Sequence, residues 1–307
     1  MTSLSSVVEA HDLKAAPRVP LWVWLLGPYL AFLVLALLLP ILYLASISVH
    51  TYSAQKIWSS VLTLQNYAKL FDGYYVDVLI RTLRIGLITT FACMILGAPL
   101  AYWLGRCSRK MLAIGLFLIV VPMMVSTVIR AFGWMILLGR NGLINQASVQ
   151  LGFGRWLNIM NTEAAVVIAL VQICLPLMVL PTMAAVEKIP MSLEEAATNL
   201  GAGPLQLFRR ILLPLASPGL ASGALLSFVV AISVVVTPAL MGGRTNRMVG
   251  NEIYDQVITA MNWPFASAMA VGLIVIVIVL LASSLALGRY LERRANARVG
   301  TDRKSVV

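Results

Sequence analysis

Six apolar stretches dominate this chain, and each is long enough to cross a membrane as a helix. A hydrocarbon core of about 30 Å takes about 20 helical residues. None of the six stretches contains an Asp or a Glu, and we place them near Leu21–Ser46, Thr82–Leu104, Met111–Leu138, Ala164–Val186, Gly219–Leu240 and Phe265–Leu287. The sequence therefore predicts an all-α, polytopic membrane protein with six transmembrane helices.

The composition is that of a membrane protein. Hydrophobic residues make up 60% of the chain, charged residues only 11%, and the mean hydropathy is +0.90. The first apolar stretch is too long for a cleavable signal peptide and lacks a clear cleavage site, so we expect it to be retained. Cys93, Cys107 and Cys174 show neither metal-ligand spacing nor a reason to pair.

Basic residues mark the side of the membrane on which each loop lies. Short inner loops are expected to hold more Lys and Arg, and the clearest clusters are the turn 106–110 and the end of the chain. Both termini are then cytoplasmic, with a leader at 1–20, a membrane domain at 21–288 and a basic tail at 289–307 that we expect to fray. The net charge of +11 indicates topology and contact with anionic lipids rather than nucleic-acid binding.

A polar loop at 187–217 separates the fourth and fifth apolar stretches. Pro190 is expected to end the preceding helix, and Ser192 with Glu195 has the spacing of a capping box, in which each side chain satisfies a free backbone N–H. We predict a helix from about Leu193 to Leu200, stopped at Gly201 by a left-handed backbone conformation. This half of the loop is a short, self-contained helix.

A second short helix is predicted after Gly203 and Pro204, because Pro is favoured at the first helical position. This helix is expected to carry one apolar stripe, which consists of Leu205, Phe208, Ile211 and Leu212. The loop as a whole predicts a compact knob on the cytosolic side, suited to a soluble partner.

The knob resembles the coupling loop of ABC importer permeases, whose signature is Glu-Ala-Ala, three residues, Gly, nine residues and Ile-x-Leu-Pro. Every fixed position is filled at the right spacing, by Glu195, Ala196, Ala197, Gly201, Ile211, Leu213 and Pro214. The resemblance implies the type I ABC importer permease fold. It also implies that these residues contact an ABC ATPase, in a bacterial inner (plasma) membrane.

Two outer segments sharpen the resemblance. Residues 130–145 and 237–265 look like the third span and the outer loops of polyamine-type permeases, closest to the first permease of spermidine/putrescine importers. Opine, aminoalkylphosphonate and other small-cation importers share these pieces, so those substrates stay open. The family implies an ATPase dimer, a second homologous permease, either a different chain or a second copy, and a periplasmic or extracellular substrate-binding protein.

Catalytic chemistry of its own is not expected for this chain. It holds no G-x-x-x-x-G-K-[ST] phosphate loop and no hydrolytic cluster, so we predict a transport subunit that is not an enzyme. No cofactor is expected in this chain, because ATP and Mg²⁺ would be bound by the partner ATPase. A lipid-modifying enzyme is disfavoured by the same absence of a nucleophile, base or metal cluster.

Polar residues within the spans are the candidates for a substrate path. The candidates are Arg130, Trp134, Gln172, Ser227, Ser233 and Thr237. Ser and Thr also serve in helix packing, whereas an amide such as Gln172 needs partners in hydrocarbon. Arg130 and Trp134 share a helix face, and a straight helix from Met111 would place Arg130 roughly 28 Å along, near the outer interface, as an anchor or a gate.

Outer loops are expected to dock the binding protein, and the candidate residues are Arg140, Asn141, Glu163, Glu252 and Asp255. Residues 251–261 read as a short amphipathic outer helix that begins with Asn251 as its cap. Because the carboxylates lie outside the spans, we expect this chain to supply a mostly neutral half of the path, with acidic groups coming from the partner permease.

The rival interpretation is a secondary transporter that acts alone. Such proteins more often carry ionisable groups within the membrane or inverted repeats with broken helices. The chain shows neither feature, and a stand-alone transporter would leave the coupling motif unexplained. We therefore favour the ATP-driven importer.

Overall fold

The computed structural model describes residues 21–304, apart from positions 54, 56, 153 and 155–158, so the predicted leader at 1–20 lies outside the described residues. The chain begins with α1 (Leu21–Ser48), passes through a hairpin and α2 (Gln65–Lys69), and enters the 34-residue helix α3 (Gly73–Arg106). The hairpin pairs β1 (His50–Ser53) with β2 (Ile57–Leu62) in antiparallel fashion. This hairpin was not predicted, but the described part of the fold is otherwise helical, as expected.

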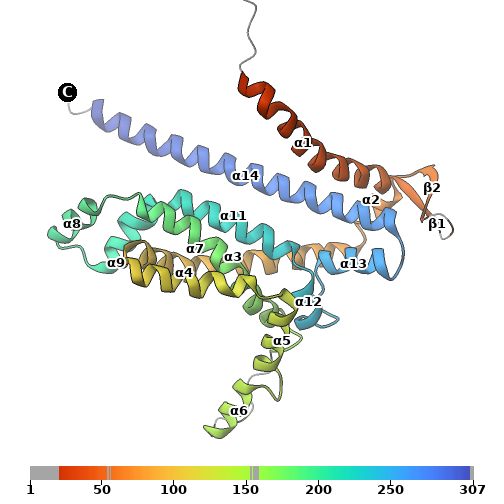
Figure 1. The fold of residues 1–307 in the computed structure, drawn as a ribbon, viewed down its shortest axis with the longest axis horizontal. Helices are drawn as coiled ribbons and strands as arrows, with labels where there is room; N and C mark the ends of the chain where they lie inside the picture. Colours follow the sequence, from red (N-terminus) through yellow and green to blue (C-terminus); the bar gives the residue numbers. More distant parts are fainter. Residues whose placement is uncertain (1–20, 54, 56, 153, 155–158, 305–307) are drawn as a thin grey trace, which may run out of the picture.

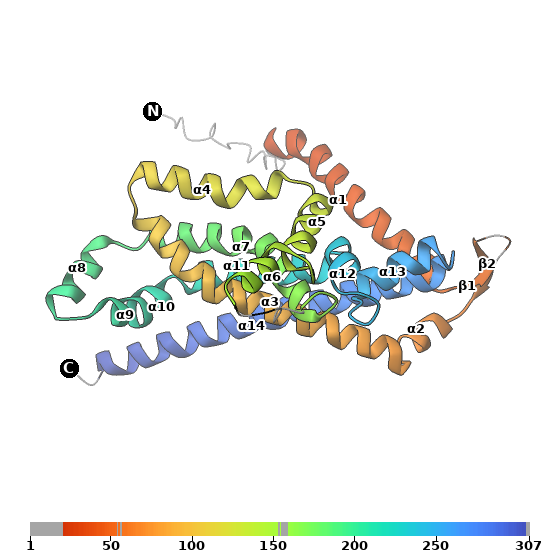
Figure 2. The same cartoon turned by 90° about the horizontal axis from the view of Figure 1, so that it is seen from below.

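Three helices form the centre of the molecule: α3, α7 (Glu163–Glu187) and α11 (Ser217–Ser233) run side by side (Figures 1 and 2). Small residues allow close approach: a Cβ added to Gly223 of α11 would lie 2.8 Å from the carbonyl oxygen of Met178 in α7. Fully buried side chains of this core include Ile85, Leu170, Met178 and Ala231.

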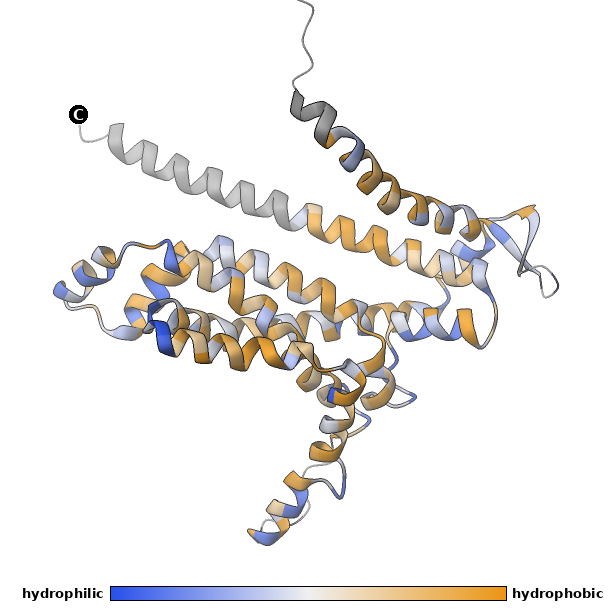
Figure 3. Ribbon diagram, in the orientation of Figure 1, coloured by the Kyte–Doolittle hydropathy of each residue, from blue (hydrophilic) through white to orange (hydrophobic). Residues whose placement is uncertain are grey.

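The number of membrane spans agrees with the prediction. Four helices are long and apolar enough to cross a membrane, and two bent helix pairs raise the number to as many as six within the described residues. Figure 3 shows hydrophobic residues along α1, α3, α7, α11 and the described first half of the last helix, with polar residues gathered in the connecting segments. The outward-facing apolar surface fits a lipid environment.

The third span is bent rather than straight as predicted. It consists of α4 (Arg109–Met124) and α5 (Thr127–Leu138), and the latter continues into α6 (Leu143–Gln150). The two halves meet at 102°, because Val125 and Ser126 adopt extended backbone conformations between them. Arg130 follows this bend, so the predicted position 28 Å along a straight helix is wrong.

The predicted fifth span also breaks. α11 ends at Ser233, and a separate helix α12 (Val236–Met241) follows, because Val234 is extended. The outer helix α13 (Val249–Ile258) has Met248 as its cap, three residues before the predicted cap Asn251. Asn251 is therefore not the cap: its Oδ1 accepts the Met248 N–H at 3.2 Å, and its Nδ2 donates to the Val235 carbonyl at 2.8 Å. The bond to Val235 joins α13 to the non-helical segment between α11 and α12.

The last helix, α14 (Trp263–Lys304), continues far beyond the predicted sixth span. Its helical assignment includes residues 289–304 of the predicted basic tail. The packing partner of α1 is α14, and α1 otherwise stands away from the central helices (Figures 1 and 2).

Candidate functional site

The predicted knob is present between α7 and α11, at one end of the molecule (Figure 1). It consists of α8 (Met191–Asn199), α9 (Pro204–Leu207), a π-helical turn (Phe208–Leu212) and α10 (Leu213–Leu215). Pro204 occupies the first turn of its helix, as predicted. The knob therefore has the helix–turn–helix form that the motif indicated.

Gly201 ends α8 as predicted, with a φ of +83°. Its N–H donates to the Thr198 carbonyl at 2.9 Å, and the N–H of Ala202 donates to the Ala197 carbonyl at 3.0 Å. This pair of bonds is the Schellman arrangement, which satisfies carbonyls left free at a helix C-terminus. A glycine is favoured here because other residues adopt this conformation only at a cost.

The predicted capping box does not form. α8 starts at Met191, with Pro190 as its cap and no side-chain capping bond, so Ser192 lies inside the first turn. Pro190 already has the extended geometry of a cap residue, which lets the helix begin two residues earlier than Leu193.

Glu194, rather than Glu195, makes the loop's ion pair. The Arg106 guanidinium lies 2.6 Å from the Glu194 carboxylate and donates from its Nη2 to the Ile189 carbonyl at 2.8 Å. Tyr102 also donates to Glu194, at 3.2 Å. Glu195 and Ala196 are exposed, while Ala197 is buried. The sequence reasoning had used Arg106 only as a marker of topology.

Apolar contacts hold the second half of the knob on the membrane domain. Leu212 is 1% exposed and packs with Val186, Ile189 and Ala216. The ring of Phe208 meets Tyr102 edge-on at 6.0 Å. The predicted stripe is thus confirmed for Phe208 and Leu212. It is wrong for Leu205, which is exposed.

Leu205 is exposed, whereas Phe208 and Leu212 pack on the membrane domain. The π-helical turn at 208–212 explains this difference, because its wider winding rotates the residues after its start relative to those before it. Ile211 is half-buried, Leu213 packs on the main core and Pro214 is exposed. The knob exposes large apolar side chains from Met191, Leu193, Leu200 and Leu205. Exposed apolar groups beside Glu195 and Ala196 form a surface suited to a protein partner.

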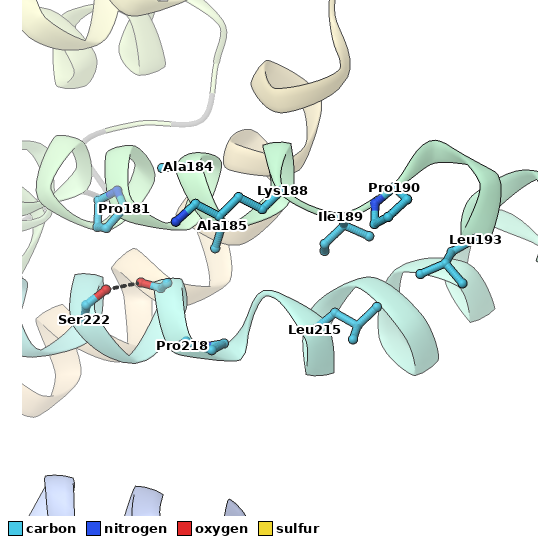
Figure 4. A pocket seen from close by; sticks show the side chains of 11 residues that line it. Pro181, Ala184, Ala185, Lys188, Ile189, Pro190, Leu193, Leu215, Pro218 and Ser222 are labelled. Atoms are coloured by element: carbon cyan, nitrogen blue, oxygen red, sulfur yellow. Dashed lines mark hydrogen bonds between the residues drawn. The ribbon is translucent and has the colours of Figure 1, made fainter. Parts of the chain in front are cut away.

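A pocket of about 660 Å³ lies beside the knob, between the facing ends of α7 and α11 (Figure 4). Its wall is mostly small or apolar, with Pro181, Ala185, Pro218 and Gly219 among its residues. Figure 4 shows the Lys188 side chain lying along this wall, opposite Ser222. The Ser222 hydroxyl donates to the Gly219 carbonyl at 2.9 Å, so the helix satisfies it locally.

A second pocket, which we call the outer chamber, lies at the far side of the bundle from the knob, among α5, α12 and α13. It has a volume of about 690 Å³, and its lining includes Phe132, Arg244, Arg247, Tyr254 and Asp255. The chamber combines aromatic, cationic and acidic side chains, whereas the lining of the pocket beside the knob is mostly small or apolar.

Arg247 joins two carboxylates at the chamber wall. Its Nε lies 3.3 Å from Glu252, and its Nη2 forms an ion pair with Asp255. The hydrogen bond that Arg247 donates to Asp255 raises the pKa of Arg247 above its ordinary value. Glu252 is buried and also accepts a hydrogen bond from Tyr74 at 2.8 Å. With Arg244, which also lines the chamber, two guanidinium groups balance the charges of the two carboxylates.

The candidate path residues are not gathered into one site. Trp134 and Gln172 do meet, through a 2.7 Å hydrogen bond between α5 and α7. Ser227 is buried and donates to the Cys174 carbonyl, so it joins α11 to α7. Ser233 donates within its own helix, and Thr237 is buried in α12. These separate locations could not be predicted, because they depend on which helices pack against one another.

Arg130 lies in the second half of the bent span. Its Nη2 approaches the Thr127 hydroxyl at 3.4 Å, and its buried Nε has no hydrogen-bond partner among the described residues. A buried N–H donor without an acceptor costs free energy in a membrane helix. A hydrogen-bond acceptor brought close to the Arg130 Nε would therefore be favourable.

The candidate docking residues lie in different surroundings. Arg140 and Asn141 are exposed in the turn before α6, where Asn145 and Gln146 bond to their backbone carbonyls. Glu163 starts α7 and pairs with Arg81 at 3.7 Å and with Arg84. Asp255 is partly exposed at the outer chamber, whereas the Glu252 side chain is 6% exposed and faces inward.

A helical membrane domain with a partner-facing knob defines a transport permease by its architecture. The chain belongs to the family of binding-protein-dependent transport system inner membrane components, whose model matches residues 78–297. It is a multi-pass inner-membrane permease of an ABC importer, a transport subunit and not an enzyme.

Two curated relatives and one solved structure show the extent of the similarity. The chain is 38% identical over 246 residues to the spermidine/putrescine transport system permease protein PotB of Escherichia coli (strain K12), covering 80% of this chain and 90% of the relative. PotB of Haemophilus influenzae is 34% identical over 252 residues, covering 82% and 88%. A bacterial alginate ABC transporter, solved with an alginate-bound periplasmic protein, is 18% identical, with a TM-score of 0.71, covering 88% and 96%. That structure supports the type I importer fold.

Proposed function

We propose that this chain is a permease subunit of an ATP-driven importer for polyamines such as spermidine and putrescine. The observation that carries the proposal is the 38% identity to PotB across 80% of the chain. In this proposal both termini are cytoplasmic, and the chain assembles in the lipid bilayer with an ABC ATPase dimer and a second, homologous permease. A substrate-binding protein delivers the polyamine, and ATP and Mg²⁺ bind to the ATPase.

The exposed side of the knob is the proposed ATPase contact. Glu195 and Ala196 lie there, and Gly201 ends the helix that presents them. Ala197, Ile211, Leu213 and Pro214 then act mainly by fixing the knob in place, because the first is buried and the rest belong to its base. A firmly held knob can transmit movement of the ATPase to the membrane helices.

The outer chamber is the proposed contribution of this chain to the substrate path. Phe132 and Tyr254 offer aromatic faces, which attract cations. The guanidinium groups of Arg244 and Arg247 balance the charges of Glu252 and Asp255, so a polycation would need carboxylates from the partner permease. Trp134 and Gln172 support the wall of α5, whereas Ser227 serves helix packing.

One observation favours a second candidate substrate class. Arg244 and Arg247 both line the chamber, and guanidinium groups pair well with carboxylates and phosphonates. An importer for opines or aminoalkylphosphonates, which carry both an amine and an acid, would use this mixed lining.

Reconstitution of the complete importer in liposomes tests the proposal. Vesicles that contain this chain, the second permease and the ATPase, with ATP inside and binding protein outside, should accumulate radiolabelled spermidine or putrescine. Unlabelled opine or aminoalkylphosphonate should not compete. Uptake of labelled opine or aminoalkylphosphonate, without uptake of polyamine, would favour the second substrate class. Uphill uptake by this chain alone, without ATPase, would establish the stand-alone transporter instead.

A further inference from the structure

Polar contacts attach α3 to the polar loop 187–217, the proposed coupling loop that contains the knob, at one end. At its other end they attach α3 to the outer chamber. We propose that α3 carries movement of the coupling loop to the outer chamber, and that Arg106 and Glu194 form its inner attachment. Arg106 and Glu194 are thus positioning residues. This inference rests on the proposed coupling to an ATPase, and it adds the route by which that coupling reaches the substrate.

The inner attachment joins one guanidinium to two parts of the loop. The Nε of Arg106 donates to Glu194 at 2.7 Å, and its Nη2 donates to the Ile189 carbonyl at 2.8 Å. The two side chains are only 14% and 12% exposed, so water screens the pair weakly. Since a guanidinium is planar and its donors are fixed in direction, these bonds set the orientation of α8 relative to α3.

Both charges also suit the helix ends on which they lie. Arg106 is in the last turn of α3, where a cation is favoured, and Glu194 is in the first turn of α8, where an anion is favoured. The pair therefore connects two helix ends of opposite partial charge. A neutral substitution on either side loses the ion pair and the interaction with the helix end together.

The outer attachment joins α3 to α13, which forms part of the chamber wall. The Tyr74 hydroxyl donates to Glu252 at 2.8 Å, and the Thr82 hydroxyl accepts the N–H of Val249 at 2.9 Å. Glu252 in turn pairs with Arg247, which lines the chamber. Two contacts, from Tyr74 to Glu252 and from Glu252 to Arg247, thus lead from the first turn of α3 to the chamber.

Between these attachments α3 is one helix of 34 residues, about 50 Å long. Figure 2 shows it crossing the molecule from the α2 end to the side on which the knob lies. Pro99 removes one backbone hydrogen bond within it, but its neighbours Ala98 and Ala101 are buried in the helix packing, which restrains bending there. A displacement of α8 can therefore shift the outer end of α3 without a hinge between them.

The test uses the complete importer in nanodiscs and measures two quantities. The first is the amount of ATPase that co-purifies, and the second is the stimulation ratio, which is ATPase activity with spermidine-loaded binding protein divided by activity without it. Arg106→Gln and Glu194→Gln should each lower the stimulation ratio about tenfold, which is within the usual range for coupling between sites. The double variant should be no worse than either single variant, and Arg106→Lys should recover part of the ratio.

Two matched controls separate this role from general loss of charge or hydroxyl groups. Arg109→Gln removes an exposed charge from the same basic turn and should keep the wild-type ratio. At the outer end, Tyr74→Phe should lower the ratio while the ATPase stays bound, because Tyr74 lies far from the knob. Tyr75→Phe, whose ring packs on Phe265 at 4.9 Å, should not lower it.

Wild-type stimulation in assembled Arg106→Gln and Glu194→Gln complexes would overturn the inference. If those variants lose the ATPase, Tyr74→Phe decides, and a wild-type ratio there would overturn it equally. A wild-type chain that binds no ATPase would contradict the proposed function instead.

Discussion

The indole Nε1–H of Trp134 donates a 2.7 Å hydrogen bond to Oε1 of Gln172, and this bond joins α5 to the central helix α7. Because α5 follows the 102° bend of the third span, it lacks the support that a straight span would receive from its own first half. The bond therefore helps to fix the wall of the outer chamber that Phe132 and Val128 form.

Trp134→Phe should lower the free energy of unfolding by about 0.5–2 kcal/mol, as measured for hydrogen bonds between membrane helices. The loss arises because the half-buried Gln172 carbonyl then lacks its donor. Unfolding of the purified protein in detergent, followed by near-UV circular dichroism, measures it. The double variant Trp134→Phe/Gln172→Met should be less destabilised than the sum of the single changes, and strict additivity would contradict the importance of this bond.

Gly201→Ala should strain the end of α8, because its φ of +83° is unfavourable for a residue with a Cβ. We expect a cost of about 1 kcal/mol in the loop and weaker retention of the ATPase during co-purification. Gly203→Ala is a matched control, since Gly203 has a φ of −72° and open space around it. Equal effects of the two substitutions would show that the left-handed turn is not what the loop requires.

Glu195→Ala tests the assignment of the ATPase contact. Glu195 is exposed, and the side-chain cap expected of it is absent from α8, so its removal should leave the unfolding midpoint unchanged. Co-purification with the ATPase and uptake should both fall. A fall in the unfolding midpoint with normal ATPase retention would reverse this assignment and make Glu195 a purely structural residue.

Local chemistry explains which parts of the loop could be predicted. The stop at Gly201 and the start at Pro204 each depend on one residue and its neighbours, and both are confirmed. The predicted capping box is wrong because Pro190 acts as the cap residue and lets the helix begin at Met191. Glu194 could not be recognised as the paired carboxylate, since its partner Arg106 lies 88 residues earlier.

Tertiary contacts explain what the sequence could not show. Apolar residues flank the breaks after Met124 and Ser233, and nothing in their periodicity distinguishes a bent span from a straight one. Asn251 was read as a cap from its position, whereas its buried amide joins α13 to Val235. The six apolar stretches, by contrast, could be read directly, because the membrane imposes their length.

The two acidic partners of Arg247 should differ in their importance for folding. Glu252 is 6% exposed and bonds to both Arg247 and Tyr74, whereas Asp255 is 36% exposed. Glu252→Gln removes the buried carboxylate that accepts from Tyr74 and pairs with Arg247, so it should cost about 2 kcal/mol in unfolding free energy even though Asp255 still pairs with Arg247. Asp255→Asn should cost less than about 1 kcal/mol, because water and Glu252 still stabilise Arg247.

Transport measurements then separate docking from passage through the membrane. Asp255→Asn and Glu163→Gln should raise the half-saturating concentration of loaded binding protein, because both carboxylates lie at partly exposed positions outside the spans. Maximal uptake should change much less, since this chain supplies a mostly neutral half of the path and the partner permease supplies the counter-charges. Loss of maximal uptake with unchanged half-saturation in Asp255→Asn would make Asp255 a residue of the path itself. The neutral-half hypothesis would then be wrong.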